Sequence, residues 1–396
     1  MTSGSWARFD DMVTGQSLLC PPPHSVHSTS HPEDVPAILA EVHAQTNAGA
    51  WAFGYVSYEA APGLDPTLET FPRSSDDPPL IWFGICDPPG TAPALLPPTQ
   101  PRMQRWAPQR NADEHEAVVE QARRYIAAGE IYQCNLTERL HTADEQEPLD
   151  LYARLAVAQH ARYSAYLDLG RYVIVSASPE LFFEWADGQI RTRPMKGTAA
   201  RHREPSDDQA AARQLHASAK ERAENIMIVD LLRNDLAKIA VLGSVTVTEL
   251  LALERYPTVW QMTSEIVAQT PDQCTLLDVF EALFPCGSVT GAPKARSMQI
   301  IRELEAGPRG VYCGAIGLVT PPTAAFRTRF NVAIRTAILD RDAARAIYGA
   351  GGGITWDSRP DDEWAELLSK AALLDHHAPS GCRTHDVARD SSTKPI

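Results

Sequence analysis

Short apolar runs bounded by turn residues follow one another along this chain, and their order limits the fold more than any other feature. Runs rich in β-branched and aromatic residues predict strands. We place such strands at 50–60, 79–87, 131–140, 171–178, 180–195, 244–250, 311–320 and 329–339. The run at 180–195 predicts a hairpin, because Asp187-Gly188 is a typical tight-turn pair. Several strands follow one another with no helix between them, so an α+β fold with antiparallel sheets is favoured over a doubly wound parallel sheet.

Apolar residues at helical spacing predict helices between these runs. The pattern at 111–130 repeats Val118, Tyr125 and Ile126 on one face, and Gly129 ends it. We expect further helices at 207–240, 275–284, 293–306 and 361–374. We find no internal repeat.

Prolines and polar residues suggest how the chain is divided. Many of the 31 prolines lie before residue 108, around the strand candidates at 50–60 and 79–87. We therefore expect a β-rich N-terminal portion at 1–105 that packs on a main domain at 106–376. The polar, aperiodic segment at 377–396 is expected to be a disordered tail.

Charge and targeting features exclude several classes of protein. The chain has 36 Lys and Arg against 50 Asp and Glu, a net charge of −14, which argues against a nucleic-acid or anionic-membrane binder. The first residues resemble neither a signal nor a transit peptide, and no apolar run reaches the ~18 residues of a membrane helix, so we expect a cytoplasmic protein. The seven cysteines are scattered and form no CxxC pair, which predicts reduced, mostly buried thiols rather than a disulfide framework or zinc site.

Two pairs of glutamates could build a metal site. Glu221 and Glu224 lie three residues apart in one predicted helix, and Glu363 and Glu366 repeat that spacing in another, with Lys370 one turn further on. Two such helices facing one cleft would offer the oxygen ligands that Mg²⁺ prefers. Solvated helix faces often carry the same spacing, so the spacing alone does not decide.

Two glycine-rich segments could bind an anion. GSVTGAPKAR (287–296) places glycines just before a predicted helix that starts at Pro293, where backbone N–H groups could hold a negative charge. GAGGGI (349–354) follows a strand candidate and could be an amide cradle. Taken alone, both segments are more typical of ordinary tight turns.

Lys196 is a candidate nucleophile. It lies in RTRPMKGTAAR (191–201), where Arg191, Arg193 and Arg201 are close in sequence. Nearby cations would disfavour the charged ammonium and so favour a nucleophilic amine. An exposed loop lysine is the alternative interpretation.

Taken together and in this order, these segments resemble the chorismate-utilising enzymes, the family of component I of aminodeoxychorismate synthase and of anthranilate synthase. The matching motifs are GEIYQCNLTER, SASPELFF, RPMKGTAAR, KERAENIMIVDLLRNDLAKIA, GSVTGAPKARSMQII, YCGAIG, FNVAIRT, YGAGGGITWDS and EWAELLSKA. They span about 110–375, roughly two-thirds of the chain. The N-terminal third is similar only through GYVSYEA and lacks the LLES-type segment of the tryptophan pocket in many relatives. The resemblance implies large antiparallel sheets flanked by helices, with the active site in a cleft between them.

The resemblance also implies roles for individual residues. Glu224 and Glu366 match direct Mg²⁺ ligands, and Glu221 and Glu363 match carboxylates that hold metal-bound water. Glu180 matches a carboxylate lining the cleft and is a candidate catalytic residue with Lys196. The residues that match chorismate contacts are Tyr312, Arg335, Ser288, Thr198, Lys370, Gly351, Gly352 and Gly353.

Three positions bear on which reaction is expected. Lys196 stands where aminodeoxychorismate synthases carry a nucleophilic lysine and anthranilate synthases typically carry alanine, and Gln133 stands where isochorismate and salicylate synthases carry a water-activating lysine. The resemblance therefore implies Mg²⁺-dependent conversion of chorismate and ammonia to 4-amino-4-deoxychorismate through a covalent lysine adduct, for p-aminobenzoate and folate or a related secondary metabolite. Gln261 replaces a histidine that often serves as the acid, and an amide cannot donate that proton. Glu180, Lys196 and metal-bound water are the remaining candidates.

The ammonia needs a source. No segment offers the Gly-flanked nucleophilic Cys, with His and Glu, of a glutamine amidotransferase, so we expect a separate amidotransferase subunit as the partner. The alternatives are anthranilate synthase component I, which makes anthranilate and pyruvate, and a noncatalytic chorismate-binding subunit. The second alternative is disfavoured because none of the four glutamates is replaced.

Overall fold

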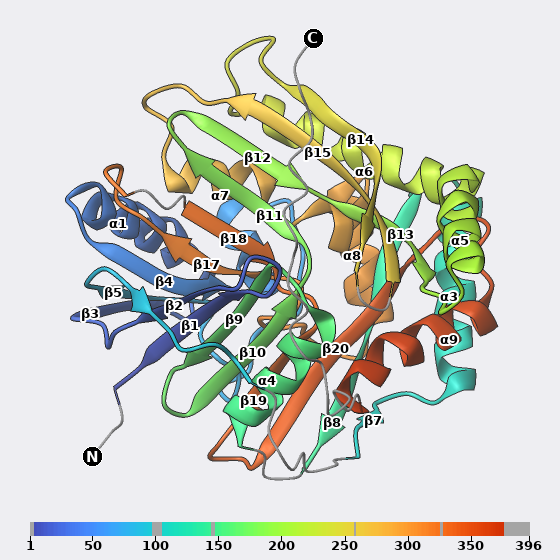
Figure 1. Ribbon diagram of the computed structural model, residues 1–396, viewed down its shortest axis with the longest axis horizontal. Helices are drawn as coiled ribbons and strands as arrows, with labels where there is room; N and C mark the ends of the chain where they lie inside the picture. Colours follow the sequence, from blue (N-terminus) through green and yellow to red (C-terminus); the bar gives the residue numbers. More distant parts are fainter. Residues whose placement is uncertain (1–3, 97–104, 144–146, 257–258, 325–327, 376–396) are drawn as a thin grey trace.

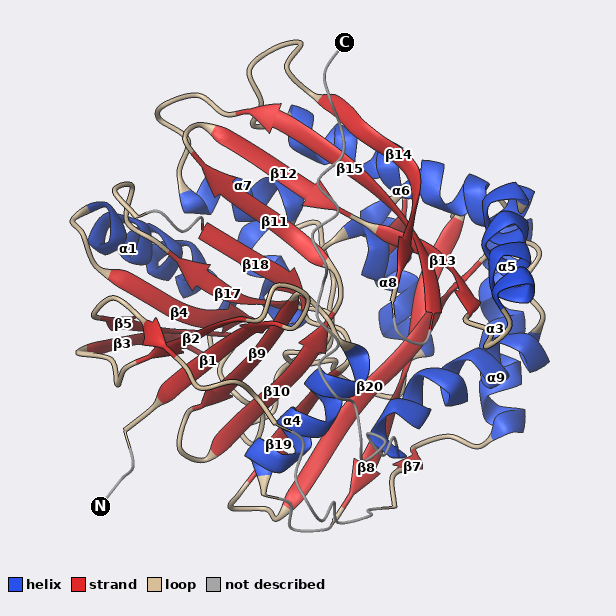
Figure 2. Ribbon diagram, viewed as in Figure 1, coloured by secondary structure: helices blue, strands red, loops and turns tan. Residues whose placement is uncertain are grey.

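The computed structural model describes residues 4–96, 105–143, 147–256, 259–324 and 328–375 (Figure 1). Within them, two large sheets face each other and helices gather around them (Figure 2). Every strand pair recorded in these residues is antiparallel, which confirms the α+β prediction. The expected disordered tail at 377–396 lies outside the described residues.

Sheet A contains β20, the strand that borders the candidate site. Its order is β16-β8-β20-β19-β10-β9-β1-β2-β6, with β7 paired to β8. The strands are β1 (Trp6–Asp11), β2 (Gln16–Cys20), β6 (Gly90–Thr91), β7 (Ala107–Pro108), β8 (Gln133–Thr142), β9 (Tyr163–Asp168), β10 (Tyr172–Ser178), β16 (Gly291–Ala292), β19 (Thr336–Asp340) and β20 (Arg345–Ile354).

Sheet B has the order β13-β15-β12-β11-β18-β17-β4-β5-β3, with β14 paired to β15. Its strands are β3 (Ser25–Thr29), β4 (Trp51–Val56), β5 (Ile81–Cys86), β11 (Leu181–Ala186), β12 (Gln189–Arg193), β13 (Met195–Ala200), β14 (Thr246–Arg255), β15 (Val259–Gln269), β17 (Ala315–Val319) and β18 (Thr328–Val332). The strands at 6–91 extend both sheets, β1 beside β9 and β4 beside β17.

The helices cover the sheets from two sides. They are α1 (Val35–Asn47), α2 (Ala61–Leu64), α3 (Ala112–Ala127), α4 (Pro148–Gln159), α5 (Pro205–Ala217), α6 (Ala219–Ala237), α7 (Leu276–Leu283), α8 (Lys294–Leu304) and α9 (Pro360–Ala371). In Figure 1, α3, α5, α6, α8 and α9 lie on the right, beside β13 and the end of β20, while α1 and α7 cover sheet B. No helix of the described residues is both long and apolar enough to cross a membrane.

The structure corrects several sequence predictions. The helix predicted at 207–240 is two helices, because Ser218 adopts an extended conformation and its hydroxyl caps α6 by accepting the Glu221 N–H. The strand predicted at 329–339 is divided between the two sheets as β18 and β19, and Arg335 turns the chain between them with φ of 52°. The glycines of 349–353, favoured as a turn, lie inside β20. Helices α1 and α4 and strand β15 were not predicted.

Cysteines and apolar side chains fill the space between these elements. The six cysteines of the described residues are free and buried, as predicted. The largest apolar cluster joins α1 and α7 to sheet B through an aromatic group that includes Phe182, Phe183, Phe280 and Phe330. Edge-to-face contacts in this group add to the free energy gained by burying the rings.

A buried ion pair joins this core to the edge of sheet A. Arg309 and Glu305 are almost fully shielded from solvent, and their nearest charged atoms are 2.6 Å apart. The guanidinium also donates to the carbonyls of Asn135 (2.6 Å) and Val289 (2.7 Å), and it stacks over the Tyr58 ring. Glu305 in turn accepts from Thr137. One cation therefore fixes β8, the turn at Gly287–Val289 and the N-terminal segment relative to one another.

Replacing Arg309 by methionine should destabilise the fold strongly, because it leaves a buried carboxylate and two carbonyls without their donor. We expect the free energy of unfolding to fall by about 3–5 kcal/mol, measured by urea denaturation. Arg302→Met is the matched control: its partner Glu69 and Arg302 itself are both about half exposed, so the loss should stay below about 1 kcal/mol. Equal losses in the two variants would contradict this interpretation.

Candidate active site

Glycines of β20 make room for the side chains predicted to form the site. The Tyr312 ring lies against the backbone of Gly349, within 2.2 Å of where a Cβ would stand. At Gly352, that position is 3.1 Å from Glu363 Oε2 and 3.7 Å from both Glu366 Oε1 and Lys370 Nζ. At Gly353 it is 3.2 Å from Lys196 Nζ. A side chain at any of these positions would compete with the groups that converge there.

The four glutamates lie on α6 and α9, at the same end of β20. Burial raises the pKa of Glu221, Glu224 and Glu363, and Glu366 raises the pKa of each of the three further by repulsion. Such mutual repulsion requires the carboxylates to be close in space. The two Glu-x-x-Glu pairs therefore lie near each other in space, and their role as metal ligands stays a prediction.

This arrangement fits a divalent cation. Carboxylates that repel each other in a half-buried site are relieved by a shared positive charge. No three His, Cys, Asp or Glu side chains of the described residues are grouped closely enough to hold one metal among them. Two direct carboxylate ligands with water in the remaining positions is nevertheless an arrangement common for Mg²⁺.

Lys370 touches this cluster directly. Its Nζ donates to Glu366 Oε1 and to the Gly351 carbonyl, both at 2.6 Å. Burial lowers the pKa of Lys370, against the attraction of Glu366. Burial also acts on Glu366, but the charges of Lys370, Lys196 and Lys220 together outweigh it and hold the pKa of that carboxyl below its usual range. Lys370 thus balances part of the negative charge.

Lys196 projects toward this cluster from β13. It affects the pKa of Glu180, Glu221, Glu224 and Glu366 by its charge, so it lies among these carboxylates. The arginines near it in sequence form ion pairs with carboxylates: Arg191 with Glu184 and Glu265, Arg193 with Glu249 and Glu254, and Arg201 with Asp208. Lys196 is not an exposed loop residue, since it is half-buried in a strand.

Glu180 is a buried carboxyl beside the lysine. Burial raises its pKa to about 7, against the opposing effects of a Ser288 hydrogen bond, the Lys196 charge and the Met195 N–H. Its Oε1 atom is buried and has no hydrogen-bond partner in the described residues. Ser288, on the short turn Gly287–Val289, is buried too. Glu180 can therefore hold a proton near neutral pH at a position facing the amine.

Tyr312 and Arg335 lie at the other end of the glycine run. Burial raises the pKa of Tyr312, and the Arg335 charge opposes this, which places the phenol and the guanidinium near each other. Arg335 Nη1 donates to the Lys370 carbonyl at 2.8 Å, so it is held against the end of α9. The remaining donors of this guanidinium match the planar fork that binds carboxylates.

Three further polar residues lie near Lys196. Gln133 is buried, and its Oε1 atom has no partner and lies 3.9 Å from the Cβ position of Gly353, close to Lys196. Thr198 is exposed, and its hydroxyl donates to Gln261 Oε1 at 2.9 Å. Within the described part of the chain, no recorded hydrogen bond joins Thr198 to the four glutamates.

Sequence reasoning did not single out Asn225. Its Nδ2 donates to the Lys196 carbonyl at 3.3 Å from a fully buried position on α6. The sequence did contain an indication of this role, because asparagine is unfavourable inside a helix unless its side chain has a specific partner.

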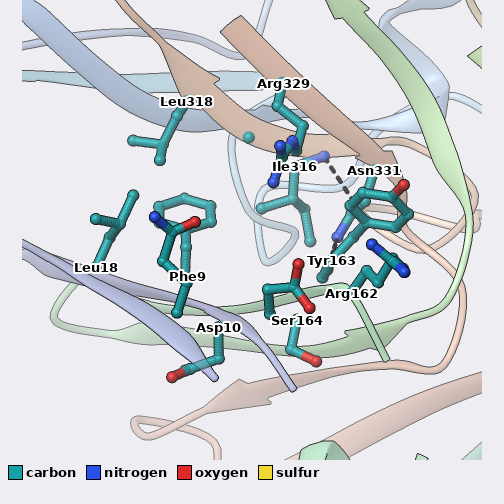
Figure 3. A pocket seen from close by; sticks show the side chains of 13 residues that line it. Phe9, Asp10, Leu18, Arg162, Tyr163, Ser164, Ile316, Leu318, Arg329 and Asn331 are labelled. Atoms are coloured by element: carbon teal, nitrogen blue, oxygen red, sulfur yellow. Dashed lines mark hydrogen bonds between the residues drawn. The ribbon is translucent and has the colours of Figure 1, made fainter. Parts of the chain in front are cut away.

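A separate cavity lies between the two sheets and contains none of the predicted site residues. Phe9, Leu18, Ile316 and Leu318 form its apolar end, and Arg162, Tyr163, Arg329 and Asn331 its polar end (Figure 3). The cluster around β20 is therefore distinct from this cavity.

Comparison with known proteins identifies a family and several relatives. A sequence model of the family described as "chorismate binding enzyme" matches residues 23–375. Aminodeoxychorismate synthase component 1 of Escherichia coli (strain K12) is 39% identical over 67% of this chain and 57% of its own length. Anthranilate synthase component 1 of Aquifex aeolicus (strain VF5) is 37% identical over 69% of this chain and 55% of its own length. The chain thus spans little more than half the length of these relatives.

A solved structure extends the comparison to nearly the whole chain. The crystal structure of anthranilate synthase component I from Streptococcus pneumoniae TIGR4 superposes with a TM-score of 0.77 and 27% sequence identity. It covers 93% of this chain and 92% of that protein. The paired sheets, including the strands at 6–91, are therefore shared with a protein of known structure.

The raised pKa of Glu180 makes a prediction about pH. Between pH 4.5, the ordinary pKa of a glutamic acid, and about pH 7, Glu180 is protonated in the native state and ionised in the unfolded state. The stability that this proton contributes is therefore fully present below pH 4.5 and is lost as the pH rises through 7. Glu180→Gln mimics the protonated form at every pH. Its stability relative to the parent should therefore grow by up to about 3 kcal/mol from pH 5 to pH 8.

Urea denaturation at several pH values measures this difference. Glu116→Gln, on the exposed face of α3, controls for the loss of one formal charge. A difference between Glu180→Gln and the parent that stays constant with pH would contradict the prediction.

Proposed function

The chain belongs to the chorismate binding enzyme family, and from this premise we propose that it converts chorismate and ammonia to 4-amino-4-deoxychorismate. The observation that carries the proposal is the position of Lys196: a primary amine 3.2 Å from the Cβ position of Gly353, among the carboxylates of α6 and α9 and beside Glu180. A lysine in such a place serves covalent catalysis, in which one difficult displacement becomes two easier ones.

In the first step, Lys196 Nζ passes its ammonium proton to Glu180 and, as the free amine, attacks C2 of the ring. The two ring double bonds shift and the C4 hydroxyl leaves as water, which requires one proton. Glu180, whose pKa is raised to about 7 by burial, is suited to donate that proton and to take up the one released by the amine. The product of this step is a secondary amine joining the enzyme to C2.

In the second step, ammonia adds at C4, the two ring double bonds shift back and the bond from C2 to Nζ breaks. Lys196 is regenerated and the enolpyruvyl group is retained. Tyr312 and Arg335 are proposed to hold a substrate carboxylate, with Ser288, Thr198, Lys370 and the backbone at Gly351–Gly353 as further contacts. Gln133, an amide, cannot activate water for attack at C2, which disfavours isochorismate formation.

The four glutamates are proposed to hold Mg²⁺, Glu224 and Glu366 directly and Glu221 and Glu363 through water. When bound, this ion would neutralise the ring carboxylate of chorismate and draw electron density from the diene. The protein contributes by holding four carboxylates at one end of β20, where their repulsion favours a cation.

Anthranilate synthesis is the second candidate, because the Aquifex relative with that name is about as similar as the Escherichia coli one. It would release pyruvate and produce fluorescent anthranilate. Lys196 favours the amino transfer that retains the enolpyruvyl group.

The ammonia is proposed to come from a separate glutamine amidotransferase subunit. Both relatives are named as component 1 of their enzymes, which is consistent with a second component. The product would serve p-aminobenzoate and folate synthesis or a related secondary-metabolite route.

The proposal is tested by incubating the protein with chorismate, Mg²⁺ and ammonium and following product mass, anthranilate fluorescence and intact-protein mass. Lys196→Ala should abolish the covalent adduct and reduce product formation at least about a hundredfold, because no other amine takes its place. Lys238→Ala, a half-exposed lysine paired with Asp235, should leave both unchanged. Product formed by Lys196→Ala at the parent rate would refute the covalent step, and fluorescent anthranilate would favour the second candidate.

The metal proposal has its own test. Glu366→Gln removes one charge from the cluster, so we expect Mg²⁺ affinity, measured by calorimetry without substrate, to fall about tenfold or more. Glu303→Gln, which lies on α8 away from the cluster, is the control. Equal Mg²⁺ affinities in the two variants would show that Glu366 is not a ligand.

A further inference from the structure

Lys196 stands on an irregularity in β13. Met195 pairs with Thr263 and Thr198 pairs with Gln261, so the two residues Lys196 and Gly197 oppose the single residue Met262. This is a β-bulge, a device that locally bends a strand and redirects its side chains. Gly197 has φ of 94°, which L-residues with a Cβ rarely adopt.

A bulge interrupts the regular ladder, so its carbonyls need other partners. Here two side-chain amides supply them. Asn225 Nδ2, on α6, donates to the Lys196 carbonyl at 3.3 Å, and Gln261 Nε2, on β15, donates to the Gly197 carbonyl at 2.9 Å. Both carbonyls of the bulge are therefore held, from opposite elements.

The two amides are themselves fixed. Ser264 Oγ donates to Asn225 Oδ1 at 2.6 Å and accepts the Leu251 N–H at 3.0 Å. Leu251 is a buried residue with φ of 58°, inside a second bulge where β14 pairs with β15. Gln261 Oε1 accepts the Thr198 hydroxyl at 2.9 Å. Each amide thus has both its donor and its acceptor engaged, which leaves one orientation for it.

We propose that Asn225 and Gln261 form an amide clamp on the β13 bulge that sets the direction of the Lys196 side chain. They are positioning residues, since neither is in contact with the amine itself. The clamp explains why a glutamine at position 261 has a use here although it cannot be an acid. The effect of the clamp on catalysis rests on the proposed function, whereas its hydrogen bonds to the bulge do not depend on that function.

The experiment uses three single variants of the full chain. Gln261→Met and Asn225→Leu keep the size of the side chain and remove the amide. Gln269→Met, an exposed residue on the same strand, is the matched control. If Asn225→Leu does not fold, because Ser264 loses its acceptor, Gln261→Met still tests the proposal.

Two measurements are made on each variant. The first is hydrogen-exchange mass spectrometry of the segment 194–200, compared with β10 of the same molecule. We expect exchange in 194–200 to rise about tenfold with β10 unchanged. The second is the rate of lysine adduct formation with chorismate and Mg²⁺, alongside the dissociation constant for chorismate. The adduct rate should fall about tenfold to a hundredfold with the dissociation constant within about twofold, because misdirecting the amine affects the reacting step alone.

The outcomes separate the clamp from the proposed function. Unchanged exchange at 194–200 in Gln261→Met overturns the clamp. A parallel loss of chorismate affinity and adduct rate also overturns it, since that is the result of general damage. If the parent protein forms no adduct but the variants still exchange faster at 194–200, the clamp is supported and the proposed function is refuted.

Discussion

The absence of side chains along one stretch of β20 is the constraint on which the rest of this structure depends. At Gly349, Gly352 and Gly353 the space that a Cβ would occupy is bordered by Tyr312, by Glu363 and by Lys196. These residues come from a loop, a helix and the other sheet. A strand of ordinary composition would hold them apart. Glycine costs conformational entropy inside a strand, so its use here requires a reason, and the convergence of polar groups is that reason.

The charges of the site illustrate how burial and proximity work against each other. Four carboxylates on α6 and α9 repel one another, and Lys370 makes a direct ion pair with one of them, Glu366. Lys196 adds a second positive charge nearby, and burial raises the pKa of Glu180 to about 7, so this carboxyl can carry a proton at neutral pH. The proposed roles in cation binding and proton transfer rest on this balance of charges.

Much of the fold followed from local patterns, whereas the roles of most site residues rest on the resemblance to the family. Strand candidates such as 171–178 and 180–195 were found because alternation and turn residues are local, and the glutamate pairs were found because helical spacing puts them on one face. The glycines of β20 were misjudged, since their partners are remote in sequence. The division of 329–339 between two sheets could not be foreseen either, because it depends on Arg335 adopting a left-handed conformation that tertiary contacts impose. Asn225 was missed because its role exists only where α6 meets a bulge of β13.

The pairing of β8 with β20 sets residue 134 beside residue 354, and α9 follows directly after. Contacts between such distant parts of a chain are entropically slow to close. The two glutamate pairs, on α6 and α9, are also far apart in sequence. The cluster of carboxylates is therefore complete only once these non-local contacts have closed, so its assembly depends on the slow steps of folding rather than on local structure.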